Sequence, residues 1–297
     1  MSCDHLAFPE NSDLAPISDR EASRDLVSPK AGLLLTPWKG GLLRAAYSRS
    51  LGGLFFDNSV RLEPTQLGGF NQAFRSLIPE SVSGIVPGTK FDAVGIGFDQ
   101  SFKGGTWFGI EAEWLRSTGD RGVGVLTNGS LLPVPDSASG TRQDLEFRER
   151  SLTAYAAQLI ADSFSVSARY RLSEATLAER FPELPAGLAG LDGVSRVEEA
   201  LLHQLSLAAN FHHSSGVFAQ WESVWLHQDN GGRSASMADE DLWQHNLAVG
   251  FRFPRRHAEL RFGLLNVFDS DYRLNPLNVL GNLPRERTFT ASLRLNF

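Results

Sequence analysis

The sequence predicts an all-β chain that forms an antiparallel transmembrane β-barrel of about eleven strands. Three observations predict this fold. Extended segments alternate apolar and polar residues along most of the chain after residue 29. Short and long connections between these segments follow each other in strict alternation. The chain also finishes on an alternating segment that runs to its last residue, an aromatic.

The alternation defines eleven candidate strands. In 164–172 the even-numbered residues are apolar and the odd-numbered residues are serine or arginine, as expected for a strand with two different faces. Two segments, 151–164 and 198–213, also carry Leu and Ala at helical spacing. We interpret them as strands because each leads through a tight turn into an alternating partner. We therefore expect strands near 29–36, 41–50, 90–102, 106–118, 150–161, 164–174, 200–212, 215–228, 241–253, 257–268 and 287–297.

The connections carry a second signal. Tight turns are expected at 37–40, 103–105, 162–163, 213–214 and 254–256, and long connections at 51–89, 119–149, 175–199, 229–240 and 269–286. Short turns at one end and long loops at the other are typical of outer-membrane barrels. About ten residues per strand, at about 3.3 Å each and tilted by about 45°, cover an apolar band of about 25 Å. Because backbone groups in lipid must be paired, we expect the sheet to close and the last strand not to remain a free edge.

Two further regions have their own predicted character. Residues 1–28 are polar and acidic, and we expect a disordered or linker lead-in before the barrel domain at 29–297. The first long connection contains a short helix candidate near 66–78. Thr65 is its cap, Leu67, Phe70, Phe74 and Leu77 share one face, and Pro79 ends it.

The composition excludes several classes of protein. The net charge is −6 and no strongly basic stretch is present, so we expect no nucleic-acid partner. The single cysteine, Cys3, excludes a disulfide framework. Neither a signal peptide nor an apolar run long enough for a membrane-spanning helix is visible.

No pattern in the sequence predicts catalysis, a cofactor or a metal. The nucleophile elbow, the Walker loop and the common zinc motifs are missing. His212 and His213 are adjacent, so their side chains point to opposite faces of a strand, which is poor geometry for chelation. The pair His227 and Asp229 has no matching nucleophile. We interpret the histidines in or beside strands as interfacial or lumen-facing polar residues; they are His203, His212, His213, His227, His245 and His257.

Aromatic residues near the strand ends predict two girdles at the membrane interfaces, with ordinary sheet packing as the alternative. The candidates are Trp107, Trp114, Trp221, Trp225, Trp243, Tyr47 and Tyr170. At the start of the last strand, Arg285, Glu286 and Arg287 predict an ion pair at the rim.

The last part of the chain resembles the C-terminal end of TonB-dependent outer-membrane receptors. Its stretch "NVFDSDY" matches that family's N-[LV]-F-D-x-x-Y motif at Asn266, Val267, Phe268, Asp269 and Tyr272. The family's last strand ends on an aromatic that the barrel-assembly machinery recognises, and the matching positions are Phe289, Leu293, Leu295 and Phe297. The stretch from "LLRAAYSRSLGG" to "SVRLEPTQLGGFNQAFRSLIPES" further resembles a bacterial group that joins tetratricopeptide repeats to a TonB-receptor-like barrel.

The resemblance implies a Gram-negative outer-membrane barrel that takes up a ligand. Members of the family have about 22 strands, a plug domain and a signal peptide. We therefore expect this chain to be a fragment, the C-terminal portion of such a barrel. The implied partners are outer-membrane lipid, the barrel-assembly machinery, the missing N-terminal half or plug, TonB, and a ligand of unknown identity. The alternatives are a passive porin-like or structural barrel without energy-coupled transport, and a soluble β-rich enzyme.

Overall fold

The computed structural model describes residues 26–51, 66–67, 70–71, 89–127, 137–183, 196–232, 240–254, 257–271 and 286–295. The predicted lead-in at 1–28 lies almost wholly outside these residues. Within them, no helix has the length and apolar character needed to cross a lipid bilayer.

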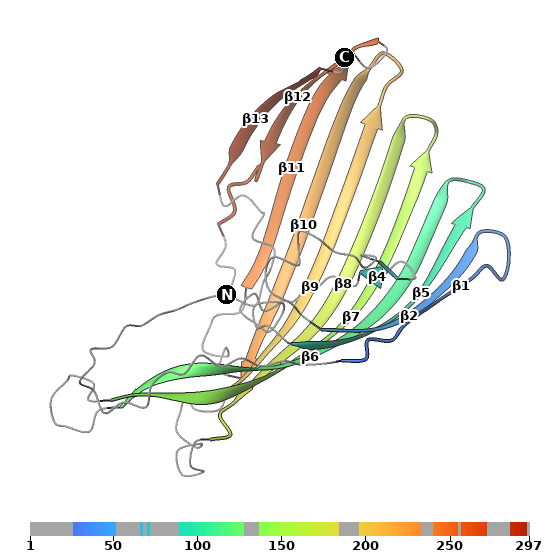
Figure 1. The fold of residues 1–297 in the computed structure, drawn as a ribbon. Helices are drawn as coiled ribbons and strands as arrows, with labels where there is room; N and C mark the ends of the chain where they lie inside the picture. Colours follow the sequence, from blue (N-terminus) through green and yellow to red (C-terminus); the bar gives the residue numbers. More distant parts are fainter. Residues whose placement is uncertain are drawn as a thin grey trace.

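Eleven strands form one antiparallel sheet, in the spatial order β1-β2-β5-β6-β7-β8-β9-β10-β11-β12-β13 (Figure 1). This confirms the all-β class and each of the eleven predicted segments, including the two with helical spacing, which lie in β7 and β9. The strands are β1 (Lys30–Leu35), β2 (Gly41–Leu51), β5 (Lys90–Phe102), β6 (Thr106–Thr127), β7 (Ser137–Ile160), β8 (Phe164–Arg180), β9 (Arg196–His212), β10 (Val217–Gly232), β11 (Glu240–Arg252), β12 (Ala258–Leu265) and β13 (Thr288–Leu295).

The two ends of the sheet differ as the sequence predicts. Neighbours in the sheet are successive strands of this set, so every second connection returns at the same end. The tight hairpins of β1–β2, β5–β6, β7–β8 and β9–β10 lie together in Figure 1. Gly105 and Gly216 have φ angles of 72° and 99°, which glycine adopts without the steric cost of a Cβ. The long connections all leave from the opposite end.

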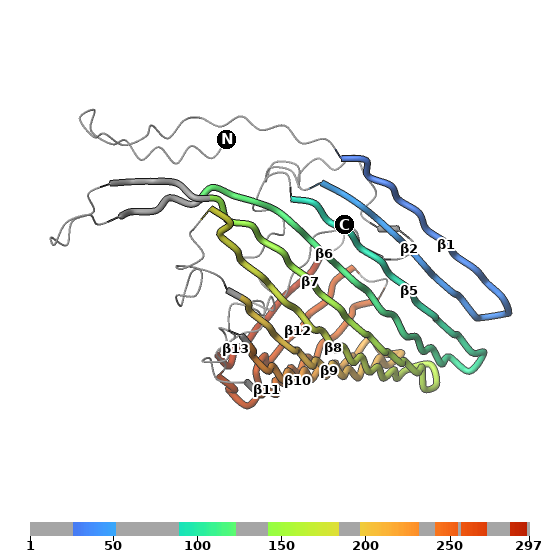
Figure 2. Tube along the Cα trace, turned by 90° about the horizontal axis from the view of Figure 1, so that it is seen from below, coloured from blue at the N-terminus to red at the C-terminus, as the bar shows by residue number. Residues whose placement is uncertain are grey.

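The sheet is strongly curved (Figure 2), and side-chain contacts identify its concave face. Arg169 Nη2 on β8 lies 3.4 Å from Glu111 Oε1 on β6, and Arg252 Nη1 on β11 lies 3.2 Å from His212 Nδ1 on β9. Each contact crosses an intervening strand, a span of about 10 Å between backbones. Side chains converge in this way on the inside of a curve. We call this side the inner face and the opposite side the outer face.

The sheet is open along the described strands. β1 and β13 are its two edges, and no pairing joins them. The two edge strands run in the same direction, because direction alternates across the eleven strands. The closure expected for a complete barrel is therefore absent between these two strands.

The middle strands are longer than predicted at the end with the long connections. β6 has 22 residues and β7 has 24. The connections expected at 119–149, 175–199 and 229–240 are thus partly wrong, since they contain the ends of β6 to β10 that lie furthest from the tight turns. The physical reason is that the apolar and polar residues of these strands change faces along the strand.

The helix expected near 66–78 is wrong where the structure describes it. Gln66 pairs with Asn71 and Leu67 with Phe70, so β3 (Gln66–Leu67) and β4 (Phe70–Asn71) form a small antiparallel ladder. The sequence between them is Gly68-Gly69, and glycine disfavours a helix interior. Thr65, Phe74, Leu77 and Pro79 lie outside the described residues.

Candidate functional site

The outer face carries an exposed apolar band. Ile96 on β5 is 50% exposed, Val249 on β11 is 55% exposed, and Phe262 on β12 is 51% exposed. Isolated exposed apolar residues are ordinary, but a contiguous surface of them marks contact with another apolar phase. The exposed members of this face include Leu33, Leu43, Val94, Ile96, Phe108, Ile110, Leu152, Phe164, Leu247, Val249, Phe262 and Leu293.

The band ends abruptly on β6, β7 and β8. On β6 the apolar outer residue Trp114 is followed on the same face by Arg116. On β7 the change falls between Leu152 and Arg150, and on β8 between Leu172 and Glu174. Trp114 pairs with Arg150, and Arg150 pairs with Glu174. The change therefore falls at this row on β7 and β8 and directly after it on β6. We call the row of Trp114, Arg150 and Glu174 the inversion row.

The inner face changes in the opposite sense at the same row. Below it, toward the tight turns, the inner residues include Glu111, Thr153 and Arg169. Above it an apolar cluster is buried, beside buried polar side chains such as Ser117, Gln143 and Glu149. This cluster consists of Leu145, Phe147, Ala175, Leu177, Ala200, Leu202, Leu226 and Leu242, each at most 5% exposed. The same strands thus turn their apolar side outward in one part and inward in the other.

This exchange separates two environments. In water a sheet buries its apolar side and exposes its polar side, as the part above the inversion row does. The part below does the reverse. On β8 it covers residues 164–172, about nine residues, which at a tilt of about 45° span about 21 Å. That height is close to the apolar band of an outer-membrane barrel.

Aromatic and histidine side chains gather on the outer face near the upper edge of the band. Trp225 stacks on His227 with ring centroids 6.0 Å apart, and Trp243 stacks on His245 at the same distance. The Tyr170 hydroxyl lies 2.7 Å from His203 Nδ1. These rings come from β8 to β11. They form one cluster that includes Tyr170, Trp225 and Trp243. Its place at a membrane interface stays a prediction.

The other predicted aromatics and histidines are distributed differently. Trp107 pairs with Ala157 on the inner face near the tight turns, so it does not belong to this cluster. Trp221 contacts His245, and Tyr47 on β2 donates to Asp92 at 3.0 Å. His212 lies on the inner face near Arg252, whereas His213 lies in the β9–β10 turn.

A network of charges crosses the inner face below the inversion row. Arg44 on β2 donates to Asp99 on β5 at 2.7 Å and to Glu111 on β6 at 3.2 Å. The Tyr155 hydroxyl on β7 donates to Asp99, and Arg169 on β8 reaches Glu111. Five adjacent strands are therefore linked, four of them by ion pairs and β7 by the Tyr155 hydroxyl. Each ionised group is partnered, which is what a polar lining between a sheet and solvent requires.

A hollow lies beside this network. Its volume is about 390 Å³, and its floor is made of small residues on β7, β8 and β9. Small side chains leave this space open, while the charged groups stand at its border. Its lining residues are Glu111, Tyr155, Ala156, Ala157, Ser167, Ala168, Arg169, Ser206, Leu207 and Ala208. The arrangement offers a recess with a polar border.

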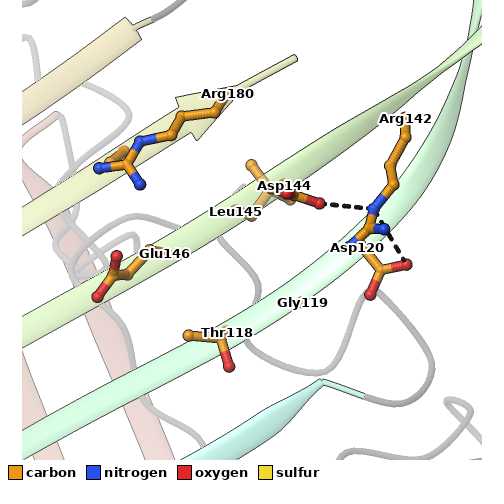
Figure 3. Close-up of a pocket in the computed structure, with 9 residues that line it drawn as sticks. Thr118, Gly119, Asp120, Arg142, Asp144, Leu145, Glu146 and Arg180 are labelled. Carbon is orange, nitrogen blue, oxygen red and sulfur yellow. Dashed lines mark hydrogen bonds and ion pairs between the residues drawn. The ribbon is translucent and has the colours of Figure 1, made fainter. Parts of the chain in front are cut away.

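A second hollow lies above the inversion row on β6 to β8 (Figure 3). Arg142 lies there 2.8 Å from Asp144 and 3.9 Å from Asp120. Close by, Glu146 accepts hydrogen bonds from Arg148 and Arg116. The hydrogen bonds from Arg148 and the positive charge of Arg116 lower the pKa of the Glu146 carboxyl, although partial burial opposes this. The hollow has a volume of about 310 Å³ and a mixed charge.

Residues 266–271 of the "NVFDSDY" segment form a tight turn after β12. Asn266 is fully buried with a φ of 50°, a left-handed conformation that Asn tolerates. Its side-chain oxygen accepts from Ser270 N at 2.8 Å, and its amide nitrogen donates to Ser270 O at 3.0 Å. Asp269 accepts from Arg287 N at 2.8 Å and so holds the start of β13. These two residues therefore have a structural role in this chain.

The remaining predicted motif residues lie at the C-terminal edge. Phe268 packs edge-on against His245 with centroids 5.1 Å apart. Phe289, Leu293 and Leu295 line the outer face of β13 and are exposed. Tyr272, Arg285 and Phe297 lie outside the described residues. Glu286 and Arg287 form no ion pair with each other, so the expected rim ion pair is not found between these two.

The described residues contain no group of three His, Cys, Asp or Glu side chains that could hold a metal ion. His227 lies 3.1 Å from Asp229 and 3.8 Å from Asp241, on the outer face and away from the inner network.

Sequence reasoning did not single out the inner network. Arg169 lies on the polar face predicted for 164–172, and Glu111 lies on the charged side of the alternation in 106–116. No face was predicted for Arg44, Asp99 or Tyr155. The juxtaposition of these five residues depends on strand register and curvature, and a single sequence does not specify either.

Comparisons with known proteins add little. No protein-family model matches the sequence, and no curated protein matches it either. Among solved structures, the fold is similar to the crystal structure of the Pseudomonas putida toluene transporter TodX. The TM-score is 0.33 and the sequence identity is 10%, over 92% of this chain and 74% of that chain. A similarity at this level supports no conclusion about fold or function.

Proposed function

We propose that this chain forms the wall of an outer-membrane β-barrel that takes part in moving a ligand across the outer membrane. The exchange of apolar and polar faces at the inversion row carries the proposal. An apolar outer band fits lipid, and a charged inner lining fits a water-filled or ligand-bearing passage. The apolar inner cluster above the row fits a part of the wall that stands in water outside the bilayer.

Strand direction indicates how such a barrel closes. β1 and β13 run in the same direction, so pairing them directly would give a parallel seam. An odd number of further strands between them keeps every pair antiparallel. We propose that a separate half of the barrel, on this or another polypeptide, supplies those strands.

We further propose that the barrel is of the TonB-dependent receptor type. It is supported by Asn266 and Asp269, whose side chains organise the turn at which the family motif occurs. Energy coupling would require parts that belong to other segments or proteins. The alternative is a passive porin-like passage, which the charged inner lining also fits. For both we propose binding or passage of a ligand and no catalysis.

The proposal is tested by the chain's behaviour in lipid. Refolded protein should be monodisperse only with detergent and should float with phosphatidylcholine vesicles in a density gradient. Monodisperse protein in plain buffer would overturn the membrane assignment. Ion conductance of vesicles that contain this chain alone would favour the passive passage. Conductance only after the complementary strands are added would favour the half-barrel.

A further inference from the structure

Three arginines lie on the outer face directly above the apolar band. Arg150 lies in the inversion row, opposite Trp114 on β6. Arg116 and Arg148 face each other one row further from the band. We call these three residues the arginine patch. From their position we propose that the patch binds the phosphorylated headgroup of a membrane lipid whose acyl chains lie against the apolar band.

The patch is held together although its charges are alike. Like charges directly opposite each other on a sheet are destabilising. Glu146 relieves this, since its Oε1 lies 2.8 Å from Arg116 Nη2 and 2.7 Å from Arg148 Nη2. The two guanidinium groups are thereby brought side by side. Both remain accessible, with side chains 58% and 62% exposed.

The patch keeps an excess of positive charge. Glu146 offsets one of the three arginines, and Glu174 lies opposite Arg150 on β8. Asp92 lies opposite Arg116 on β5, but its carboxylate is paired with Arg49 at 2.6 Å. The Arg150 side chain makes no ion pair or hydrogen bond with any described residue. Further from the band the situation differs, since Arg142 is matched by Asp144 and Asp120 (Figure 3). Unmatched positive charge is thus found next to the apolar band and not at the more distant site.

The chemistry of arginine favours a phosphate at this place. A guanidinium group donates two parallel hydrogen bonds to phosphate, and its apolar stem can lie along an apolar surface. Here the apolar surface is formed by Trp114 and Leu152, which border the patch on the side of the tight turns. A phosphorylated lipid can contact both the guanidinium groups and the apolar surface, whereas a free anion contacts only the guanidinium groups.

This inference rests on the proposed membrane location, and its test separates the two. The refolded chain in neutral detergent micelles is titrated with lipid A, which carries phosphates on an acylated sugar headgroup, and bound lipid is counted by native mass spectrometry. The same lipid without its phosphates, and inorganic phosphate, are the comparison probes. We expect phosphorylated lipid A to bind about tenfold more tightly than the dephosphorylated lipid, and inorganic phosphate not to compete at equal concentration.

The variants locate the site. R150Q should weaken lipid A binding by about threefold, and R116Q/R148Q/R150Q by about tenfold or more. R150Q breaks no described contact, so it remains informative if the triple variant does not fold. R180Q, on the same face further from the band, and R261Q, on the inner face of β12, should bind as the unaltered chain does.

Equal binding by R150Q and the unaltered chain would overturn the proposal, as would equal losses in R180Q or R261Q. Full displacement by inorganic phosphate would overturn the lipid assignment in favour of a free-anion site. In all three cases flotation with vesicles tests the membrane location separately. If the protein still floats, the proposed function stands although the lipid site is ruled out.

Discussion

Tyr155 on β7 reaches Asp99 on β5 directly over the backbone of β6. Gly109 is the β6 residue that leaves room for this contact. A Cβ at that position would lie 2.5 Å from the Tyr155 ring and hydroxyl and 2.7 Å from Asp99 Oδ1. The inner network therefore depends on the absence of a side chain at one place.

We expect G109A to disrupt this contact and lower the free energy of unfolding by about 1–3 kcal/mol, the usual cost of overpacking a filled site. Denaturant titration in detergent, followed by tryptophan fluorescence, measures it. G122A is the matched control on the same strand, because a Cβ there meets nothing within 4 Å. Equal stability of the two variants would contradict the described packing.

The outer band predicts a strong dependence on which face receives a charge. F262R places a guanidinium on the outer face in the middle of β12 and should cost about 2–4 kcal/mol in lipid vesicles. S292R places the same group on the inner face of β13, next to the position opposite Phe262, and should cost little. Reversible unfolding from vesicles in urea measures both. Similar penalties at the two positions would show that the faces are misassigned.

Above the inversion row the apolar side chains should behave as a protein core. Phe147 is 1% exposed, so F147A should cost about 3–5 kcal/mol through lost burial and a cavity. Phe108 is 39% exposed on the outer band, and F108A should cost far less, because lipid replaces the lost contacts. Unfolding titrations in vesicles compare them. A larger loss for F108A would contradict the exchange of faces.

The turn after β12 should depend on both the conformation and the side chain of Asn266. N266G keeps the left-handed backbone accessible but removes the hydrogen bonds to Ser270, and should cost about 1–3 kcal/mol. N266A adds a steric penalty of about 1–2 kcal/mol at this positive φ angle. The same unfolding titration orders the two variants. If N266A is the more stable variant, the backbone is not left-handed in solution.

Most of the fold can be predicted from period-2 alternation. Each of the eleven segments was recognisable, because a strand between two different phases repeats its choice of residue at every second position. The asymmetry of the connections fixed which hairpins share an end. Residues 151–164 show the limit of this reasoning, since their helical spacing was settled only by neighbouring strands.

The ends of β6 to β10 that lie furthest from the tight turns are not predicted from the sequence, and the reason is physical. Residues 143–149 also alternate, but their apolar members Leu145 and Phe147 have the opposite parity to Leu152, Ala154 and Ala156. If one apolar face per strand is assumed, the predicted strand ends where the parity changes. The sequence did contain the signal, namely two alternating runs in opposite phase. To predict the inner network, the strand register and the curvature of the sheet would have to be known as well.

The most direct test of the exchange of faces is a cysteine scan along β7 in lipid vesicles. In a C3S background, single cysteines at 144–156 carry a fluorophore, which is exposed in turn to a quencher dissolved in the acyl chains and to one dissolved in water. We expect quenching from the acyl chains at positions 152, 154 and 156, none at 153 and 155, and an abrupt end to this pattern between Leu152 and Arg150. Uniform quenching by the aqueous probe on both faces, or quenching from the acyl chains at 144–148, would contradict it.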